Sequence, residues 1–403
     1  MLHQGVLPEV ESVLQSMWSS AHVTIVEGPP GSGRTEAALY AAALASLDGL
    51  VIFIVGNASC IPLVEELFMT NFPKLSISRS LKDASTGVVI VSFLDLLSTI
   101  PSDFNVPWII IDDADYLDDA IFALISPLGQ RFVLTSCTSS LRLPYTRGFD
   151  FKDHYFNMTS IQGIKQRSWI EPSIITLRTS YRLPQDTVDV LSPLSFSPKF
   201  RASSGYPSRS IDLPSMFSLH LEVDRAISLS SSGVSLIGCS LPSLSLSPRV
   251  DRSSIAIVKD FIDRFTTCEF KLVMFGQERI FDPSDLMIIV PNHAHFDAVR
   301  RCVPDGFLVC LSEDTLPSKP LVIVLDVDTS SGVNERSQFL YRSLTCHQIA
   351  CFVVSRTRTI ESPNLSFSIF PTRNRIFENN QFVLGLSLAL SQADRHIFFR
   401  DRS

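Results

Sequence analysis

The sequence lacks the motifs of several common chemistries. Its eight cysteines include no C-x-x-C pair, and it contains no G-x-S-x-G motif. Closely spaced cysteine pairs are typical of zinc ribbons and redox sites, so we expect no zinc module and no disulfide framework. Without G-x-S-x-G, acyl transfer by a serine nucleophile has no support. Scattered, unpaired cysteines indicate a reducing compartment, which we take to be the cytoplasm, with the nucleus as an open alternative.

The sequence also has no surplus of basic residues and no long apolar run. Lys and Arg number 34 against 41 Asp and Glu, which gives a formal net charge of -7. This balance argues against a generally basic nucleic-acid-binding surface but leaves a local groove open, because steering depends on how charge is distributed. Asp48 and Gly49 interrupt the most apolar region, residues 37–55, so we expect no membrane span. The N-terminus lacks the charged-then-apolar order of a signal peptide.

What is present suits a globular protein of two domains. The 403 residues are 45% hydrophobic and 19% charged. The first third alternates apolar β-like runs with helical patterns, which is typical of α/β folds with a parallel sheet covered on both faces. We expect a first domain at 1–165, a second domain at 166–375 and a C-terminal tail at 376–403. Within the second domain, a Ser/Pro-rich segment near 202–255 favours loops and a poorly fixed conformation.

The residues from Val23 to Glu36 form the strongest motif. A β-branched run from Val23 to Val26 predicts a buried strand, the letters GPPGSG predict a tight loop, and TEAALYAAALA predicts a helix. From Gly28 to Thr35 the spacing is that of the phosphate-binding loop, with Arg34 in the position of the usual lysine. Glycines let backbone amides approach phosphate oxygens, and the start of the helix adds a positive dipole end. The hydroxyl of Thr35 is placed to ligate magnesium.

Paired carboxylates follow a second apolar run. Trp108 to Ile111 predict a strand that ends at Asp112 and Asp113. Such a pair can place magnesium with one carboxylate and act on the attacking water with the other. The alternative is a solvated acidic loop, because further aspartates follow at 115, 118 and 119.

Two later arginines can complete an active site. Arg182 lies in TSYRLP and Arg356 in VVSRTRT, each just after an apolar β-like run. Guanidinium groups contributed by a second domain would stabilise charge on a transferring phosphoryl group. Taken singly, both are ordinary surface arginines.

Two further features are open to more than one interpretation. His293 and His295 form an H-x-H pair, but no acidic or cysteine partner is near in sequence, so we interpret them as packing residues and not as metal ligands. The alternate leucines at 384, 386, 388 and 390 fit a strand face or a helix, and their period does not decide between the two.

Taken in order, the motifs resemble those of a superfamily 1 helicase core of the nonsense-mediated-decay helicase type, a group whose motifs nidovirus replicative helicases share. The matching segments are GPPGSGRT, VIFIVGNASCIPLVEEL, VVIVSFLDLL, IIIDDAD, LRTSYRLP, DLMIIVPNHAHFDAVR and FVVSRTR. Together they span about residues 5 to 360. The resemblance implies two RecA-like P-loop NTPase domains, ATP and Mg²⁺ as cofactors, and single-stranded nucleic acid as the partner. Only the resemblance favours RNA over DNA.

The resemblance also implies roles for individual residues. The phosphates would lie on a cradle made by Gly28, Gly31, Gly33, Arg34 and Thr35. Asp112 would hold magnesium with Thr35, and Asp113 would stand where the general-base glutamate sits. Arg182 and Arg356 would be arginine fingers, and Tyr181 would stack on adenine.

The resemblance places three polar residues at the nucleic-acid backbone. They are Asn57 and Ser59, which follow one predicted strand, and Ser92, which ends another. Amide and hydroxyl donors of this kind hold a strand by its phosphates without reading its sequence.

The sequence departs from the family at several positions. Arg34 is a broad planar fork where lysine is a compact ammonium, so the terminal phosphate would be misplaced. Asp113 is one methylene shorter than glutamate. The Gly-Asp…Gln motif appears as TSCTSSLRLP, and the Gln-Gly-x-Glu motif as TLPSKP, so the groups that couple ATP to strand movement are missing together. An inserted barrel is also not visible.

Two functional hypotheses follow. The first is an ATP-binding, helicase-type ATP hydrolase on single-stranded nucleic acid, with weakened hydrolysis. The second is a pseudo-helicase without turnover that serves as a nucleic-acid or protein-binding scaffold, including a trimmed viral movement-type helicase.

Overall fold

The computed structural model describes residues 8–56, 58–81, 85–99, 104–137, 159–168, 170–195, 199–204, 209–215, 217–242, 250–274, 276–311, 316–327, 333–356, 382–383, 385–392 and 394–400. The chain divides into two compact units, Met1–Ser180 and Tyr181–Ser403. Among the described residues, every helix is too short or too polar to cross a lipid bilayer.

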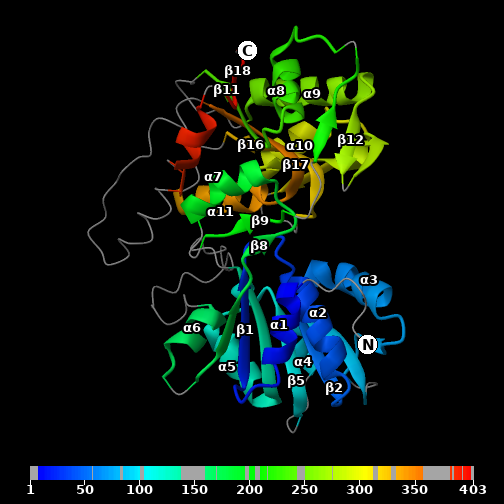
Figure 1. Cartoon of the computed structure of the whole chain (residues 1–403), viewed down its shortest axis with the longest axis vertical. Coiled ribbons are helices and arrows are strands. Elements are labelled where there is room, and N and C mark those ends of the chain that lie inside the picture. Colours follow the sequence, from blue (N-terminus) through cyan, green and yellow to red (C-terminus); the bar gives the residue numbers. More distant parts are fainter. Residues whose placement is uncertain are drawn as a thin grey trace, which may run out of the picture. The chain divides into compact units, whose positions relative to one another are not determined.

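A parallel sheet forms the centre of the first unit (Figure 1). Its described strands run in the order β3-β4-β2-β5-β6-β1-β7, and every pairing between neighbours is parallel. The strands are β1 (Val23–Gly28), β2 (Leu50–Val55), β3 (Ile77–Ser78), β4 (Gly87–Ser92), β5 (Val106–Asp112), β6 (Gly129–Cys137) and β7 (Ser173–Thr176), followed by the short β8 (Thr179–Ser180). The strand before the predicted phosphate loop, β1, is separated from the strand of the paired aspartates, β5, by β6.

Helices cover both faces of this sheet because successive strand residues point to opposite faces. Phe53 packs with α1 (Pro8–Ser16), α2 (Arg34–Ala45) and α3 (Ile61–Asn71), whereas Ile52 and Ile54 pack with α4 (Phe93–Thr99), α5 (Asp119–Ile125) and α6 (Ser160–Gln166). In Figure 1, α1 and α2 accordingly lie on one side of β1, and α5 and α6 on the other. Short 3-10 turns complete the unit: η1 (Ala58–Cys60), η2 (Ala114–Tyr116) and η3 (Ser126–Leu128).

A second parallel sheet organises the second unit, with described strands in the order β15-β14-β16-β17-β11-β18. These are β11 (Leu236–Leu241), β14 (Leu286–Val290), β15 (Leu308–Leu311), β16 (Lys319–Asp326), β17 (His347–Arg356) and β18 (His396–Phe398). An antiparallel sheet joins β10 (Ser210–Asp212), β12 (Lys271–Met274) and β13 (Gln277–Ile280). The remaining elements are α7 (Gln185–Ser195), β9 (Arg201–Ala202), α8 (Glu222–Ser231), α9 (Arg252–Thr267), η5 (Pro283–Asp285), α10 (His293–Arg300) and α11 (Val333–Leu344).

The predicted fold class is confirmed: the chain is α/β, and both units carry a mostly parallel sheet flanked by helices. The division between the units follows Ser180, whereas the sequence placed it after residue 165. Residues 173–176 stay with the first unit because β7 pairs in parallel with β1.

Two expectations about the second unit are wrong. The Ser/Pro-rich segment contains α8 and β11, and every residue of β11 is buried between β17 and β18. Burial in the sheet outweighs the local preference of its Ser and Gly residues. The described residues of the predicted C-terminal tail at 376–403 are part of the second unit, because β18 pairs with β11 and Phe399 is buried in the core. Of the alternate leucines, those within 385–390 are helical.

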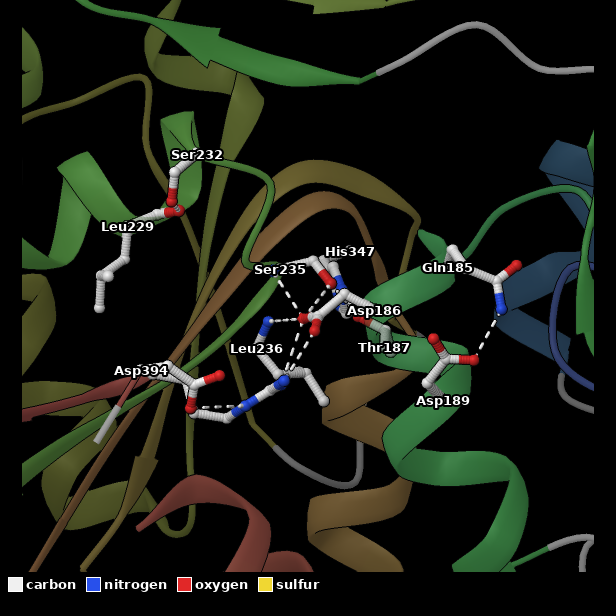
Figure 2. Close-up of polar contacts among 11 residues, drawn as sticks. Gln185, Asp186, Thr187, Asp189, Leu229, Ser232, Ser235, Leu236, His347 and Asp394 are labelled. Atoms are coloured by element: carbon white, nitrogen blue, oxygen red, sulfur yellow. Dashed lines mark hydrogen bonds and ion pairs between the residues drawn. The ribbon is translucent and has the colours of Figure 1, made fainter. Parts of the chain in front are cut away.

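Asp186 fastens the C-terminal strand to the start of the second sheet (Figure 2). Its carboxylate lies in the first turn of α7 and accepts hydrogen bonds from the backbone N–H groups of Ser235 and Leu236, at 2.8 and 3.2 Å. The hydroxyl of Ser235 donates to it at 3.0 Å, and the guanidinium of Arg395 forms an ion pair with it at 2.8 Å. Charge-assisted bonds of this kind are stronger than neutral ones. The segment before β18 is therefore held by side chains as well as by strand pairing.

A buried histidine continues this network. His347 is fully buried, and its Nε2 lies 2.7 Å from the hydroxyl of Thr187, which lies 2.6 Å from that of Ser235 (Figure 2). Burial lowers the pKa of His347 from 6.5 to about 4, and the positive charges of Arg209 and Arg182 act in the same direction. The native second unit therefore holds this imidazole neutral.

The second unit is expected to lose stability on mild acidification. Because the pKa of His347 is about 4 in the folded chain and 6.5 ordinarily, the unfolded chain binds the proton first as pH falls below 6.5. The stabilisation present above pH 6.5 is lost on approach to pH 4, and about 2 kcal/mol is gone at pH 5. Hydrogen exchange of the β17 amides at pH 7.5 and 5.0, corrected for intrinsic exchange, measures this loss.

His347→Gln is the control, since it removes the titrating group and should flatten the pH dependence of β17. The three tryptophans, Trp18, Trp108 and Trp169, all lie before residue 181, so their fluorescence follows the first unit separately. An equal loss of β17 protection in wild type and in His347→Gln would contradict the prediction.

Candidate functional site

The predicted phosphate loop joins β1 to α2 in the first unit. β1 ends at Gly28 and α2 begins at Arg34. Gly31 and Gly33 have φ values of 75° and 88°, in the left-handed region that favours glycine. Gly33 is the N-cap of α2, and it provides no side-chain cap for the helix. The first amides of α2 thus lack a side-chain cap, which is the arrangement that binds anions at helix starts.

Close packing under the loop explains Gly28. A Cβ atom at this position would lie 2.3 Å from the Ser32 hydroxyl and 3.0 Å from the Cβ of Leu177. The hydroxyl of Ser32 is buried and, among the described residues, has no hydrogen-bond partner. Any side chain at residue 28 would therefore push the loop outward.

Arg34 turns back onto the loop and onto the paired aspartates. Its Nη1 donates to the carbonyl of Gly28 at 2.6 Å, and its Nη2 contacts Oδ1 of Asp113 at 3.2 Å. The side chain is 15% exposed. Burial by itself lowers the pKa of Arg34, but attraction to Cys137, Asp113 and Asp115 outweighs it and raises the pKa. The guanidinium is charged and already has two protein acceptors.

Asp112 lies next to Thr35, as a magnesium site requires. Asp112 is buried at the end of β5, where it accepts a hydrogen bond from the hydroxyl of Thr135 at 2.6 Å, and the side chain of Thr35 also lies close enough to lower its pKa. Burial and the neighbouring charge of Asp113 raise the pKa of Asp112 to about 6, against the effect of these hydroxyls. A threonine hydroxyl beside a carboxylate is the donor set that Mg²⁺ takes in phosphate-loop enzymes, so the residues fit the ion.

Asp113 has an unusual backbone for a residue with a side chain. Its φ is 50°, in the left-handed region, and it leads into η2. Its N–H donates to the hydroxyl of Thr135 at 2.8 Å, so the same threonine holds both aspartates. The carboxylate is 42% exposed. Strain of this kind is typical of functional sites, where surrounding contacts hold it in place.

Asp115 belongs to the same group, although the sequence indicated only an acidic loop. Its carboxylate accepts hydrogen bonds from the N–H of Cys137 at 2.6 Å and from the hydroxyl of Ser136 at 2.8 Å. Burial raises the pKa of Asp115 to about 6 despite these donors. The alternative of a solvated acidic loop is therefore wrong for this residue. The D-D-x-D spacing was the only signal in the sequence that could have identified it.

The two predicted arginine fingers lie at opposite ends of β17 within the second unit. Arg182 contacts the carbonyl of Thr345 at 3.5 Å, just before β17 begins at His347. Arg356 is the last residue of the strand. From His347 to Arg356 the strand advances nine residues, and at about 3.3 Å per residue its two ends lie roughly 30 Å apart. The second unit, as folded, does not bring these two guanidinium groups to one point.

Arg356 is also buried within its own unit. It is 5% exposed, and its Nε and Nη2 form a fork with the carboxylate of Asp251 at 2.7 and 2.6 Å. Its Nη1 donates to the carbonyl of Pro242 at 2.8 Å. Asp251 is the N-cap of α9, where it accepts from the amides of two residues of the first turn. Arg356 thus joins the end of β17 to the start of α9.

The other predicted residues are placed as follows. The hydroxyl of Ser92 donates to Asp95 at 2.6 Å and accepts from the N–H of Asp95 at 3.2 Å, which is the pattern of a helix cap at the start of α4. Tyr181 is the first residue of the second unit, and its carbonyl accepts from Arg209 at 2.7 Å. Asn57 and the side chain of Ser59 lie outside the described residues.

His295 is a packing residue. It is buried, and its ring nitrogens lie 3.1 Å from the N–H of Asp251 and 2.9 Å from Oδ1 of Asn292. Among the residues that the structure describes, no group of three or more His, Cys, Asp and Glu is placed to hold a metal ion. The magnesium site considered above is not a group of this type, because it consists of one carboxylate, Asp112, and one hydroxyl, Thr35.

Comparison with known proteins gives structural likeness only. No family model matches the chain, and no curated protein sequence matches it. Among solved structures, the crystal structure of an arterivirus nonstructural protein 10, a helicase, is 11% identical with a TM-score of 0.43, and covers 86% of this chain and 61% of its own. The same helicase in complex with DNA is 12% identical with a TM-score of 0.42, and covers 89% and 63%. The chain spans about three fifths of the length of these proteins.

Proposed function

We propose that the chain binds ATP with magnesium on its first unit and hydrolyses it weakly, as a helicase-like protein of single-stranded nucleic acid. The closeness of the Thr35 side chain to the Asp112 carboxylate, beside the glycine loop, carries the first part of this proposal. The loop amides and Arg34 would bind the phosphates, and Thr35 and Asp112 would hold the ion. When bound, Mg²⁺ neutralises the charge that develops on the phosphates.

Weak hydrolysis is supported by the ion pairs that Asp113 and Arg356, two predicted catalytic residues, form within the chain. A base must reach the attacking water, and Asp113 is instead paired with Arg34. An arginine finger must be free to reach the terminal phosphate, and Arg356 is buried against Asp251. Nucleotide can therefore bind while the chemical step lacks well-placed groups.

The choice of nucleic acid rests on the order of the sequence motifs and on their resemblance to superfamily 1 helicases. RNA is the partner that we propose on that ground. Ser92 caps α4, so its role at a nucleic-acid backbone would require that cap to open. A filter-binding titration with single-stranded RNA and DNA of one length measures this preference.

The second candidate is a scaffold that binds nucleotide or nucleic acid without turnover. The buried pair of Arg356 and Asp251 favours it, because the pair gives Arg356 a structural role. Multiple-turnover phosphate release, with and without single-stranded RNA, separates the two candidates. Release above background that RNA stimulates supports the enzyme, and release at background supports the scaffold.

Asp112→Asn is expected to abolish the effect of magnesium on ATP affinity. The amide keeps an oxygen for the hydroxyl of Thr135 but loses the charge that would hold the ion. In wild type, Mg²⁺ should tighten ATP binding about tenfold relative to EDTA, and in the variant the two affinities should agree within about twofold. Isothermal titration of ATP with Mg²⁺ and with EDTA measures both.

Asp48→Asn is the matched control, since Asp48 also accepts a neutral hydrogen bond, from the indole of Trp108 at 3.1 Å. It should retain the magnesium effect. Failure of the wild-type chain to bind ATP under either condition would remove the proposed function.

A further inference from the structure

The chain leaves the first unit alongside the phosphate loop. β7 pairs in parallel with β1 as far as Glu27 and Thr176, and the N–H of Leu177 donates to the carbonyl of Glu27 at 2.7 Å. Three residues later, the hydroxyl of Ser180 donates to the carbonyl of Pro30 at 2.8 Å. Ser180 is 1% exposed, so water does not compete for this bond. The last residue of the first unit is thus fastened to the middle of the loop.

The chain is held again directly after Ser180, in the second unit. The carbonyl of Tyr181 accepts from Nη2 of Arg209 at 2.7 Å, and the carbonyl of Arg182 accepts from its Nη1. Nη1 of Arg209 also reaches the carbonyl of Gln348, on β17, at 3.5 Å. Arg209 therefore ties the first two residues of the second unit to its central sheet.

Almost no free chain separates these two attachments. Ser180 and Tyr181 are consecutive residues joined by one planar peptide, whose Cα atoms are about 3.8 Å apart. A flexible linker would absorb a movement of the loop within its many dihedral angles, whereas one planar peptide has only a single soft backbone dihedral on each side and absorbs little of it. A large shift of the Pro30 carbonyl therefore breaks the Ser180 bond or displaces Tyr181.

We propose that Ser180 is a positioning residue that transmits occupancy of the phosphate loop to the second unit. This rests on the proposed function, because it requires the loop to bind a nucleotide. The residues that the family uses for coupling are missing in TSCTSSLRLP and TLPSKP, and the bond from Ser180 to Pro30 offers a separate route. The loop rearranges when phosphate binds, its Pro30 carbonyl moves, and Tyr181 and α7 respond.

The variant that tests this is Ser180→Ala, with Ser180→Thr as its conservative partner. Alanine removes the donor and leaves the Pro30 carbonyl without this bond, whereas threonine retains the hydroxyl and suits an extended backbone. The full-length chain is titrated with ATP and Mg²⁺ by calorimetry. Hydrogen exchange is then followed at the loop and in α7, with and without nucleotide at saturation.

We expect Ser180→Ala to retain ATP binding but to lose the response of α7 to nucleotide. ATP affinity should change by less than about fivefold in Ser180→Ala, the equivalent of one neutral hydrogen bond. In wild type and Ser180→Thr, nucleotide should alter exchange both in the loop and in α7, and in Ser180→Ala only in the loop. A merely structural role would alter exchange in α7 without nucleotide and leave the response to nucleotide intact.

The control is Ser16→Ala, which removes another hydroxyl bond of the first unit, the 2.7 Å contact between Ser16 and Ser173. It should preserve the α7 response. If wild type binds ATP but α7 does not respond, or if α7 still responds in Ser180→Ala, the inference is wrong and the proposed function survives. If wild type does not bind ATP, both fail.

Discussion

Arg34→Lys is expected to raise the rate of ATP hydrolysis about a hundredfold. In the wild-type chain, Nη1 of Arg34 donates to the carbonyl of Gly28, and Nη2 donates to the carboxylate of Asp113. An ammonium group cannot bridge two acceptors in the same planar geometry, so lysine would release Asp113 to act on water and would reach the terminal phosphate as a point charge. Small improvements in the alignment of reacting groups change rates by factors of this size.

Steady-state phosphate release under saturating ATP and Mg²⁺ measures the effect. Arg131→Lys is the matched control: Arg131 also donates to backbone carbonyls, those of Met17 and Ser19, but lies at the start of β6, away from the loop. Its turnover should equal that of wild type. No gain in Arg34→Lys, with ATP affinity unchanged, would mean that the remaining catalytic groups are deficient and would favour the scaffold.

Asp251→Ala is expected to destabilise the second unit by about 3–5 kcal/mol. The side chains of Arg356 and Asp251 are 7% and 4% exposed, and removal of one partner leaves the other charge buried without compensation. The same substitution removes the N-cap of α9, which adds about 1 kcal/mol. Urea denaturation followed by hydrogen exchange of the β17 and α9 amides measures the loss.

Asp282→Ala provides the comparison, because Asp282 caps η5 through the N–H of Ser284. It should cost much less stability than Asp251→Ala, because it removes a cap alone. Tryptophan fluorescence of the first unit should be unaffected by either variant. Equal losses in the two variants would show that the pair contributes little, and Arg356 would then be a better candidate for an arginine finger.

The loop and the first aspartates were predictable because their signals are local. A strand, a glycine loop and a helix follow one another between Val23 and Ala45, and the apolar run before Asp112 ends at the same edge of the sheet. Carboxyl ends of parallel strands meet at one edge, so polar residues there come together in any such fold. The sequence therefore sufficed to place Thr35 near Asp112.

The interactions that decide how these residues act are not local. The partner of Arg34 is 79 positions away, and that of Arg356 is 105 positions away. The threonine that holds both aspartates, Thr135, lies on a neighbouring strand and carries no motif of its own. Sequence spacing predicts none of these pairs, because they form only when separate strands and helices pack.

The sequence by itself determined the α/β class, the glycine loop with its arginine, and the aspartates at the end of β5, since each depends on neighbouring residues along one strand or turn. Tertiary structure alone decided that Arg34 binds Asp113, that Arg356 is buried on Asp251, and that Ser180 is bonded to the loop. The reason is physical: a charged or hydroxyl side chain that loses water on folding must find its partner wherever packing brings one.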